Sequence, residues 1–376
     1  MGGASGGVRL EVPQHAVCGV DPAREGAGDP GGGPVGVRGR GAVAAPTGGG
    51  ALLSQVPRSG VAARQTEAVD LSVELAGLRL KNPVLCASGP LGHGREVAQA
   101  YELSAFGAFV TKSITLEPRE GNPRPHLAET EGGWLNSVGL RNPGLAAFLT
   151  KDLPFLRTLG IPVVASVAGH SADEFCTLAR WLDEADGVAA VELNVSCPNV
   201  LDGLLFGTDP ERTRSLVAAV RRVVRRPLFV KLAPHVLDPV AAARAAVEAG
   251  ADALVVTNTV PAMAVDVRTR RPKLGGVTGG LSGPALRPVA VRMVWEISRA
   301  VPVPVVGVGG ICTWEHAVEF FLAGARAVGM ASALLQDPQA HLKVVQGLRD
   351  YLAAEGFVSV ASLVGRLELV ELGDRG

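Results

Sequence analysis

Eight short apolar segments recur along the chain, and each is separated from the next by a stretch long enough for a helix. Strands that are apolar on both faces and alternate with helices build a parallel sheet. Eight such repeats over about 250 residues predict an α/β fold, a (β/α)8 TIM barrel. The alternative is a doubly wound open sheet, which the absence of a G-x-G-x-x-G turn after the first segment disfavours. The segments are 83–88, 108–114, 162–169, 189–196, 227–234, 253–259, 304–310 and 327–332.

The stretches between these segments carry helix-terminal signals. Three of these stretches begin with a residue that caps a helix N-terminus. In each case proline follows at the first helical position or glutamate at the third. These are Asp209 before Pro210, Asp238 before Pro239, and Ser171 with Glu174. Glycine is the usual residue just past a helix C-terminus. The glycines that we expect in this role are Gly107, Gly160, Gly187, Gly250 and Gly324.

The composition changes near residue 66. Residues 1–60 hold 17 of the 48 glycines and six prolines, with no sustained apolar period. A segment of this kind cannot bury enough apolar surface to fold. We therefore expect residues 1–66 to be a disordered Gly/Ala/Pro-rich extension or an over-long start. The barrel domain is predicted over 67–360, opening with a short hairpin over 71–80, and a C-terminal tail is predicted over 361–376.

The charges balance, since 36 Lys and Arg face 36 Asp and Glu. This excludes a strong overall field for nucleic acid or an acidic membrane, and we expect neither as a partner. The five cysteines form no CxxC pair and show no metal-ligand spacing. That pattern predicts no metal site and no disulfide scaffold, and it favours a reducing, cytoplasmic setting. We expect no transmembrane helix, because no apolar run approaches the required length of about 18 residues.

Three connections are too long for simple barrel loops. They span 115–142, 197–208 and 260–283, and each follows the C-terminal end of a strand, namely the second, the fourth and the sixth. Long ordered connections in a compact domain are usually functional, and TIM-barrel active sites lie on this face. We therefore predict the site at the C-terminal ends of the strands.

Charged and small residues at these strand ends favour an anionic, phosphorylated ligand. Lys112 and Lys231 lie inside apolar runs, where a lysine is costly unless it meets an anion or a polar group. The alternative is that both lysines point to solvent beyond the rim. Small residues after the seventh and eighth strands are typical of the phosphate site of these barrels, since backbone N–H groups can approach the ligand there. These small residues are Gly309, Gly310, Ala331 and Ser332, with Gly283 as a further candidate.

Cys197 follows the fourth strand in a polar stretch and precedes Pro198. A buried apolar role suits Cys86, Cys176 and Cys312 better than it suits this residue. Cys197 is therefore a candidate nucleophile or general base. Four asparagines near the same face favour a flat, amide-rich ligand, although turn formation is the alternative reason for their presence. They are Asn136, Asn194, Asn199 and Asn258.

Four motifs in these loops are specific enough to indicate a family. They read NVSCPN over 194–199, NSVGL over 136–140 with NPG over 142–144, TLEPREGNP over 115–123, and GGLSGP over 279–284. With these motifs the chain resembles the class 1 dihydroorotate dehydrogenases, and in particular subclass 1B, over about residues 70–355. The resemblance implies FMN at the mouth of the barrel and a substrate stacked on its isoalloxazine ring.

The resemblance also implies roles for individual residues. Cys197 matches the catalytic base. The implied FMN-binding residues are Ser88, Lys112, Ser113, Ser166, Asn194, Lys231, Thr257, Gly283, Gly309, Gly310, Ala331 and Ser332. The implied substrate-binding residues are Lys112, Asn136, Ser137, Val138, Gly139, Leu140, Asn194, Asn199, Asn258 and Thr259. The chain departs from the family's pattern at Ser166, Thr257 and Ala331, which stand where Asn, Val or Ile, and Gly are usual.

The implied reaction is the oxidation of (S)-dihydroorotate to orotate in de novo pyrimidine (UMP) biosynthesis, with hydride transfer to FMN. Subclass 1B further implies a homodimeric core and a partner subunit that carries FAD and a 2Fe–2S cluster and passes electrons to NAD. Reduction of fumarate is the alternative fate of the electrons. The alternative functions are those of a related FMN-dependent dihydropyrimidine dehydrogenase and of a flavin-free TIM-barrel lyase or isomerase that acts on a phosphorylated substrate.

Overall fold

The computed structural model describes residues 69–195 and 206–369. The chain divides into two units, 1–66 and 67–376, and the described residues all belong to the second. The predicted extension, Cys197 and Asn199 lie outside the described residues.

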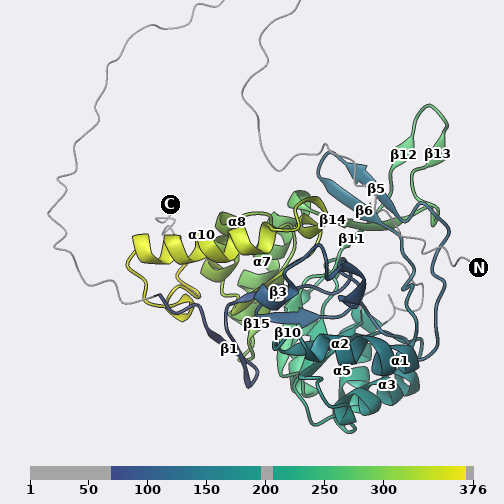
Figure 1. The fold of residues 1–376 in the computed structure, drawn as a ribbon, viewed down its shortest axis with the longest axis horizontal. Coiled ribbons are helices and arrows are strands. Elements are labelled where there is room, and N and C mark those ends of the chain that lie inside the picture. The colour runs from purple at the N-terminus through teal and green to yellow at the C-terminus, as the bar shows by residue number, and fades with distance from the viewer. Residues whose placement is uncertain (1–68, 196–205, 370–376) are drawn as a thin grey trace, which may run out of the picture. The chain divides into compact units, whose positions relative to one another are not determined.

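Eight parallel strands close into a barrel, which confirms the predicted fold (Figure 1). Each strand arises from one of the eight apolar segments, and every strand residue is buried because helices cover the outer face and side chains fill the interior. Around the barrel the order is β10-β15-β16-β3-β4-β7-β8-β9. The strands are β3 (Val84–Cys86), β4 (Ala108–Val110), β7 (Val163–Val167), β8 (Ala190–Asn194), β9 (Leu228–Lys231), β10 (Ala253–Val256), β15 (Val305–Val308) and β16 (Ala327–Met330).

The longer helices start where the capping residues predict. Ser171, Asp209 and Asp238 each accept a backbone N–H of the first helical turn through a side-chain oxygen. The longer helices are α3 (Ala172–Glu184), α5 (Pro210–Arg221), α6 (Pro239–Glu248), α7 (Arg287–Ser298), α8 (Trp314–Leu322) and α10 (Ala340–Ala354). Shorter helical pieces are η1 (Arg95–Val97), η2 (Leu103–Ala105), α1 (Leu145–Ala147), the π-helix η3 (Phe148–Asp152), α2 (Leu153–Arg157), η4 (Pro284–Leu286), α9 (Ala333–Gln336) and η5 (Val360–Ser362).

Four of the five predicted helix-terminal glycines have the positive φ that this role requires, whereas Gly107 does not. Gly107 is needed for a different reason, because a Cβ atom there would lie 2.0 Å from the carbonyl oxygen of Asn82. Gly107 does follow the end of the short helix η2, as predicted, but a close backbone approach rather than a left-handed turn explains the glycine.

The predicted hairpin before the barrel is confirmed as β1 (Val73–Leu75) paired antiparallel with β2 (Leu78–Leu80). At the other end of the chain, Leu363 is buried. The backbone N–H groups of Gly365 and Leu367 bond to carbonyl oxygens near the end of α8. No helix among the described residues is long and apolar enough to cross a membrane.

Two of the long connections combine into a second sheet. Strands β5 (Leu127–Thr130) and β6 (Gly133–Asn136) come from the first connection, and β11 (Val260–Ala262) and β14 (Gly279–Ser282) come from the third. They pair antiparallel in the order β11-β14-β6-β5. The sheet lies at the C-terminal end of the barrel, because its residues line the same cavity as the barrel strand ends.

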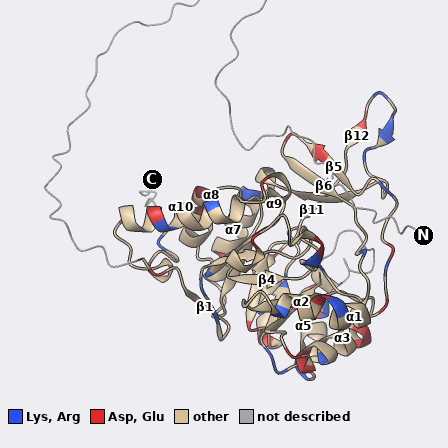
Figure 2. Ribbon diagram, viewed as in Figure 1, with Lys and Arg blue, Asp and Glu red and all other residues tan. Residues whose placement is uncertain are grey.

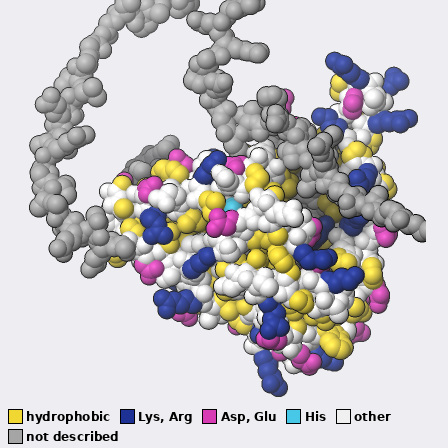
Figure 3. Space-filling model, in the orientation of Figure 1, with side chains coloured by type: hydrophobic (Ala, Val, Ile, Leu, Met, Phe, Trp, Pro, Cys, Tyr) yellow, Lys and Arg dark blue, Asp and Glu magenta, His cyan; other side chains and the backbone are white. Residues whose placement is uncertain are grey.

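A narrow hairpin, β12 (Val265–Asp266) with β13 (Arg271–Pro272), extends away from this second sheet. Lys and Arg positions are blue along its ribbon in Figure 2, and their side chains protrude in Figure 3. Its exposed cations are Arg268, Arg270, Arg271 and Lys273.

Candidate active site

A cavity of about 390 Å³ opens between the C-terminal strand ends and the second sheet. It brings together most of the predicted site residues, which come from all parts of the barrel. Of the residues predicted for FMN, its lining includes Ser88, Lys112, Ser113, Asn194, Lys231, Thr257, Gly283, Gly309, Gly310, Ala331 and Ser332. Of those predicted for the substrate alone, it includes Asn136, Val138, Leu140, Asn258 and Thr259.

Three described residues from the predicted set do not line the cavity. Ser166 is buried inside the barrel. Ser137 is also buried, and its hydroxyl accepts a hydrogen bond from the Asn122 amide at 3.0 Å. Gly139 has φ +70°, and a Cβ atom there would lie 2.4 Å from the Asn122 side-chain oxygen. Ser137 and Gly139 therefore shape the loop that carries Asn136, Val138 and Leu140.

Two lysines face the cavity, as the sequence predicts for an anion site. Lys231 ends β9 and is only 6% exposed. Burial lowers the pKa of Lys112; nearby Glu96 opposes this shift and the Arg141 guanidinium adds to it. An anionic ligand placed between these groups would recover the electrostatic free energy that burial costs.

A ladder of hydrogen bonds crosses the cavity floor. The Asn258 amide donates to the Asn194 side-chain oxygen at 3.1 Å, and the Asn194 amide donates to the Ser113 hydroxyl at 2.9 Å. The Ser113 and Ser166 hydroxyl oxygens are 3.2 Å apart. These contacts fix the orientation of the two amides on the side of the cavity where a flat ligand would lie.

The glycine segment after β15 can hold a phosphate group. The backbone N–H groups of Gly309 and Gly310 bond to no other described residue, and both residues line the cavity. Gly310 has φ +67°, and a Cβ atom there would lie 2.6 Å from the Gly283 carbonyl oxygen. Free N–H donors in a segment too tight for side chains suit a phosphate, so the residues present fit the phosphate end of FMN.

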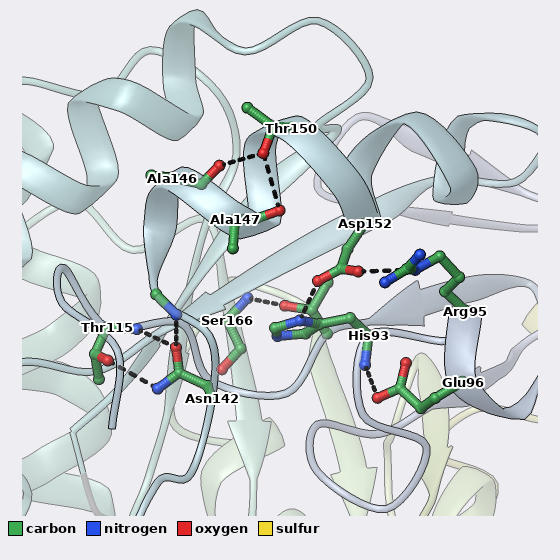
Figure 4. A network of polar contacts seen from close by, with 12 residues as sticks. His93, Arg95, Glu96, Thr115, Asn142, Ala146, Ala147, Thr150, Asp152 and Ser166 are labelled. Carbon is green, nitrogen blue, oxygen red and sulfur yellow. Dashed lines mark hydrogen bonds and ion pairs between the residues drawn. The ribbon is translucent and has the colours of Figure 1, made fainter. Parts of the chain in front are cut away.

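Asn142 ties two of the sequence motifs together beside the cavity (Figure 4). Its side-chain oxygen accepts the N–H groups of Thr115 and Gly144, at 3.3 and 2.9 Å. Its amide donates to the Thr115 hydroxyl at 2.8 Å and to the Leu140 carbonyl at 2.7 Å. The four bonds use the full capacity of a buried amide, and they hold the loop that places Leu140 at the cavity wall.

A buried hydrogen bond between a histidine and an aspartate supports the loop after β3 (Figure 4). His93 Nδ1 lies 2.8 Å from Asp152 Oδ2, and Arg95 Nε lies 3.4 Å from Asp152 Oδ1. Asp152 is the last residue of the π-helix η3, an element that often occurs at functional sites. In the same loop, the Gly92 carbonyl oxygen accepts the backbone N–H of Lys112. The contact between His93 and Asp152 therefore helps to hold the strand end that carries Lys112.

The sequence reasoning missed several lining residues. Leu127 and Trp134 belong to the second sheet, and His126 directly precedes it. No local pattern marks them, because their position depends on pairing between distant segments. Arg141 also lines the cavity. It lies between Leu140 and Asn142, so its position between two motif segments could have identified it as a candidate site residue.

No group of three or more His, Cys, Asp or Glu residues within 69–195 and 206–369 is arranged to hold a metal ion. The cavity instead combines cations, amides and free N–H donors at the mouth of a barrel. A sequence model of the family described as dihydroorotate dehydrogenase matches residues 70–352, which is most of the chain. The chain belongs to the dihydroorotate dehydrogenase family.

Relatives in this family are similar along nearly their whole length. The chain is 50% identical over 299 residues to "Dihydroorotate dehydrogenase B (NAD(+)), catalytic subunit" of Trichlorobacter lovleyi, covering 79% of this chain and 98% of the relative. It is 49% identical over 300 residues to the protein of the same name from Pelobacter propionicus, covering 80% of this chain and 99% of the relative. Dihydroorotate dehydrogenases are FMN-dependent oxidoreductases, and this chain is one of them.

Proposed function

We propose that the chain oxidises (S)-dihydroorotate to orotate in pyrimidine biosynthesis, as the catalytic subunit of an NAD-linked enzyme. The observation that carries the proposal is the single cavity in which Lys112, Lys231, Asn194 and Asn258 meet the Gly309-Gly310 segment. The printed names of the relatives, which describe NAD-linked catalytic subunits, support it.

The lining residues divide between cofactor and substrate. The N–H groups of Gly309 and Gly310 would hold the FMN phosphate, and Lys231 would stabilise negative charge on the ring system. FMN supplies the acceptor for the hydride that leaves C6 of the substrate. A dihydropyrimidine ring presents N–H donors and carbonyl acceptors in one plane. The Asn194 and Asn258 amides, already held by the hydrogen-bond ladder, offer complementary groups.

The substrate carboxylate needs a positive partner. Lys112 and Arg141 both line the cavity and lie close enough for Arg141 to lower the pKa of Lys112. We infer that this pair binds the carboxylate and orients the ring for reaction.

The proton at C5 needs a base. The neighbouring carbonyl makes C5–H acidic, and removal of that proton together with loss of hydride from C6 forms the C5–C6 double bond of orotate. Cys197, predicted from the sequence and outside the described residues, would take the proton as its thiolate.

Transfer of the electrons from FMN to NAD requires a second protein chain. The relatives' names, which describe a catalytic subunit of an NAD-linked enzyme, support a partner subunit. We infer from the resemblance to subclass 1B that this partner carries FAD and a 2Fe–2S cluster and that the core is a homodimer. The odd, low cysteine count supports a reducing compartment, and we place the reaction in the cytoplasm.

The electron acceptor can be tested with the isolated chain. This chain should reduce a soluble dye efficiently and NAD poorly, and addition of the partner subunit should restore NAD reduction. Rapid NAD reduction by the chain alone, or turnover with fumarate, would contradict this route.

Purified protein tests the reaction directly. Denaturation should release FMN in nearly equal amount to protein, and anaerobic dihydroorotate should bleach the flavin absorption. Dihydrouracil, which lacks the carboxylate, should bleach it far more slowly, because Lys112 and Arg141 would have no partner. Absence of FMN, with no affinity for added FMN, would refute the proposal. Equal rates with both compounds would favour a dihydropyrimidine dehydrogenase instead.

A further inference from the structure

The barrel interior contains a carboxyl group directly below the cavity. Glu192 lies in the middle of β8 and is only 1% exposed. It lines a small internal pocket together with Lys231, and Ala87, Ser88 and Val308 line both this pocket and the main cavity. TIM-barrel interiors are filled mainly by apolar side chains, so a carboxyl group at this depth has a cost that some function must offset.

Glu192 lies at the inner end of the hydrogen-bond ladder. Ser166 pairs with Glu192 in the register of β7 and β8, and its hydroxyl lies close enough to the carboxyl group to act on the pKa of Glu192. Because the Asn194 amide donates to Ser113, the Ser113 hydroxyl hydrogen can point on to Ser166, and the Ser166 hydrogen to Glu192. The ladder therefore runs in one direction, from Asn258 in the cavity to a final acceptor at Glu192.

The surroundings of Glu192 suit a neutral acid. Burial raises the pKa of Glu192, while the Lys231 charge and the bond from Ser166 oppose that shift. Its Oε1 atom is buried and has no hydrogen-bond partner among the described residues. A buried carboxylate with one oxygen left without a donor would be strongly destabilising, whereas a carboxylic acid tolerates this arrangement far better.

We propose that Glu192 is a positioning residue of the site, held as a neutral carboxylic acid that accepts the last hydrogen bond of the ladder. In this role it sets the direction in which the Asn194 and Asn258 amides present their donors and acceptors. Because it is neutral, it does not offset the positive charge that Lys231 brings to the cavity. The positioning role rests on the proposed function, whereas the neutral state of the acid does not.

Infrared spectroscopy tests the neutral state with or without FMN. The wild-type spectrum minus that of Glu192→Gln should contain the C=O stretching band of a protonated carboxylic acid. The exposed residue Glu355 provides the control, since Glu355→Gln should remove only carboxylate bands. Absence of the protonated band from the Glu192 difference spectrum would overturn the inference.

Orotate binding to the FMN-loaded protein tests the positioning role. Glu192→Gln keeps a neutral acceptor and should bind orotate within about twofold of wild type. Glu192→Leu removes the acceptor and should weaken binding about tenfold, in line with the loss of a buried hydrogen bond. If Glu192→Leu does not fold, Ser166→Ala cuts the same ladder one step earlier and should weaken binding to a similar extent.

The outcomes separate this inference from the proposed function. Wild-type protein that binds neither FMN nor orotate would refute the function, while the infrared band would still report on the acid. Wild-type protein that binds orotate while Ser166→Ala and Glu192→Leu bind it equally well would overturn the positioning role alone.

Discussion

At the scale of single residues, Lys112 shows how burial prepares a side chain for a charged ligand. It lies in the cavity with Arg141 nearby, and burial lowers its pKa. The sequence predicted its place from one observation, a lysine inside an apolar segment. It could not predict Arg141 as a neighbour, because that contact depends on how the following loop folds back.

The lowered pKa of Lys112 predicts a pH dependence. The protonated lysine binds the substrate carboxylate, so the affinity for orotate should fall as the pH rises through this lowered pKa, at a lower pH than for an ordinary lysine. Lys112→Met should bind orotate at least about tenfold more weakly and lose this alkaline dependence. Binding titrations followed by flavin absorption measure both effects. The exposed Lys151 gives the control Lys151→Met, and an unchanged alkaline slope in Lys112→Met would assign the titration to another group.

Cys197 carries the second residue-scale prediction. Cys197→Ala should keep FMN but slow anaerobic flavin reduction by dihydroorotate by a factor on the order of 10² or more, as for loss of a positioned base. Cys197→Ser should recover part of the rate at high pH. Stopped-flow absorption measures the rates, and Cys176→Ala on α3 should behave as wild type. A wild-type rate for Cys197→Ala would place the base elsewhere.

At the scale of elements, the π-helix η3 and the second sheet surround the barrel mouth with parts that no local pattern marks. The extra residue of a π-helical turn places Asp152 against His93, two residues that are 59 positions apart. Strands β6 and β14 pair across an even longer separation, with Gly280 opposite Asn136. Each of these strands is only four residues long, so pairing rather than propensity decides that they form.

The buried pair between His93 and Asp152 should stabilise the fold. Asp152→Asn removes the charge from a buried, hydrogen-bonded partner and should lower the free energy of unfolding by about 2 kcal/mol. Asp186→Asn is the matched control, because Asp186 forms a 2.6 Å ion pair with Arg157 at the surface, where its side chain is 83% exposed. The control should change stability by less than about 0.5 kcal/mol. Thermal unfolding followed by circular dichroism compares the two, and equal effects would contradict the assignment.

At the scale of the whole molecule, a compact barrel accounts for the described residues from the hairpin β1–β2 to η5. Within residues 69–195 and 206–369, the hydrophobic core is built mainly from Ala, Val and Leu side chains, and the barrel and its hairpin supply these side chains themselves. The family match begins at the same place, at residue 70.

We therefore predict that residues 1–66 can be removed. A chain that starts at Ala68 should fold, bind FMN and oxidise dihydroorotate at the wild-type rate, because the glycine-rich segment cannot bury enough apolar surface to contribute. Melting temperature, FMN content and dye reduction measure the result. A second deletion that starts at Lys81 would remove β1 and β2 and should lower stability, since Leu75 and Leu80 are fully buried. Loss of folding in the first deletion would refute the boundary.

The sequence by itself determined the barrel and most of the candidate site. Apolar segments and caps such as Asp209 and Asp238 act over a few residues, and a lysine inside such a segment is visible without a structure. Only the tertiary structure decided which long loops pair into the second sheet, and that Glu192 is buried beside Ser166 beneath the cavity. The physical reason is that strand formation and capping depend on local free energies. Pairing, burial and pKa shifts depend on contacts between segments that are far apart along the chain.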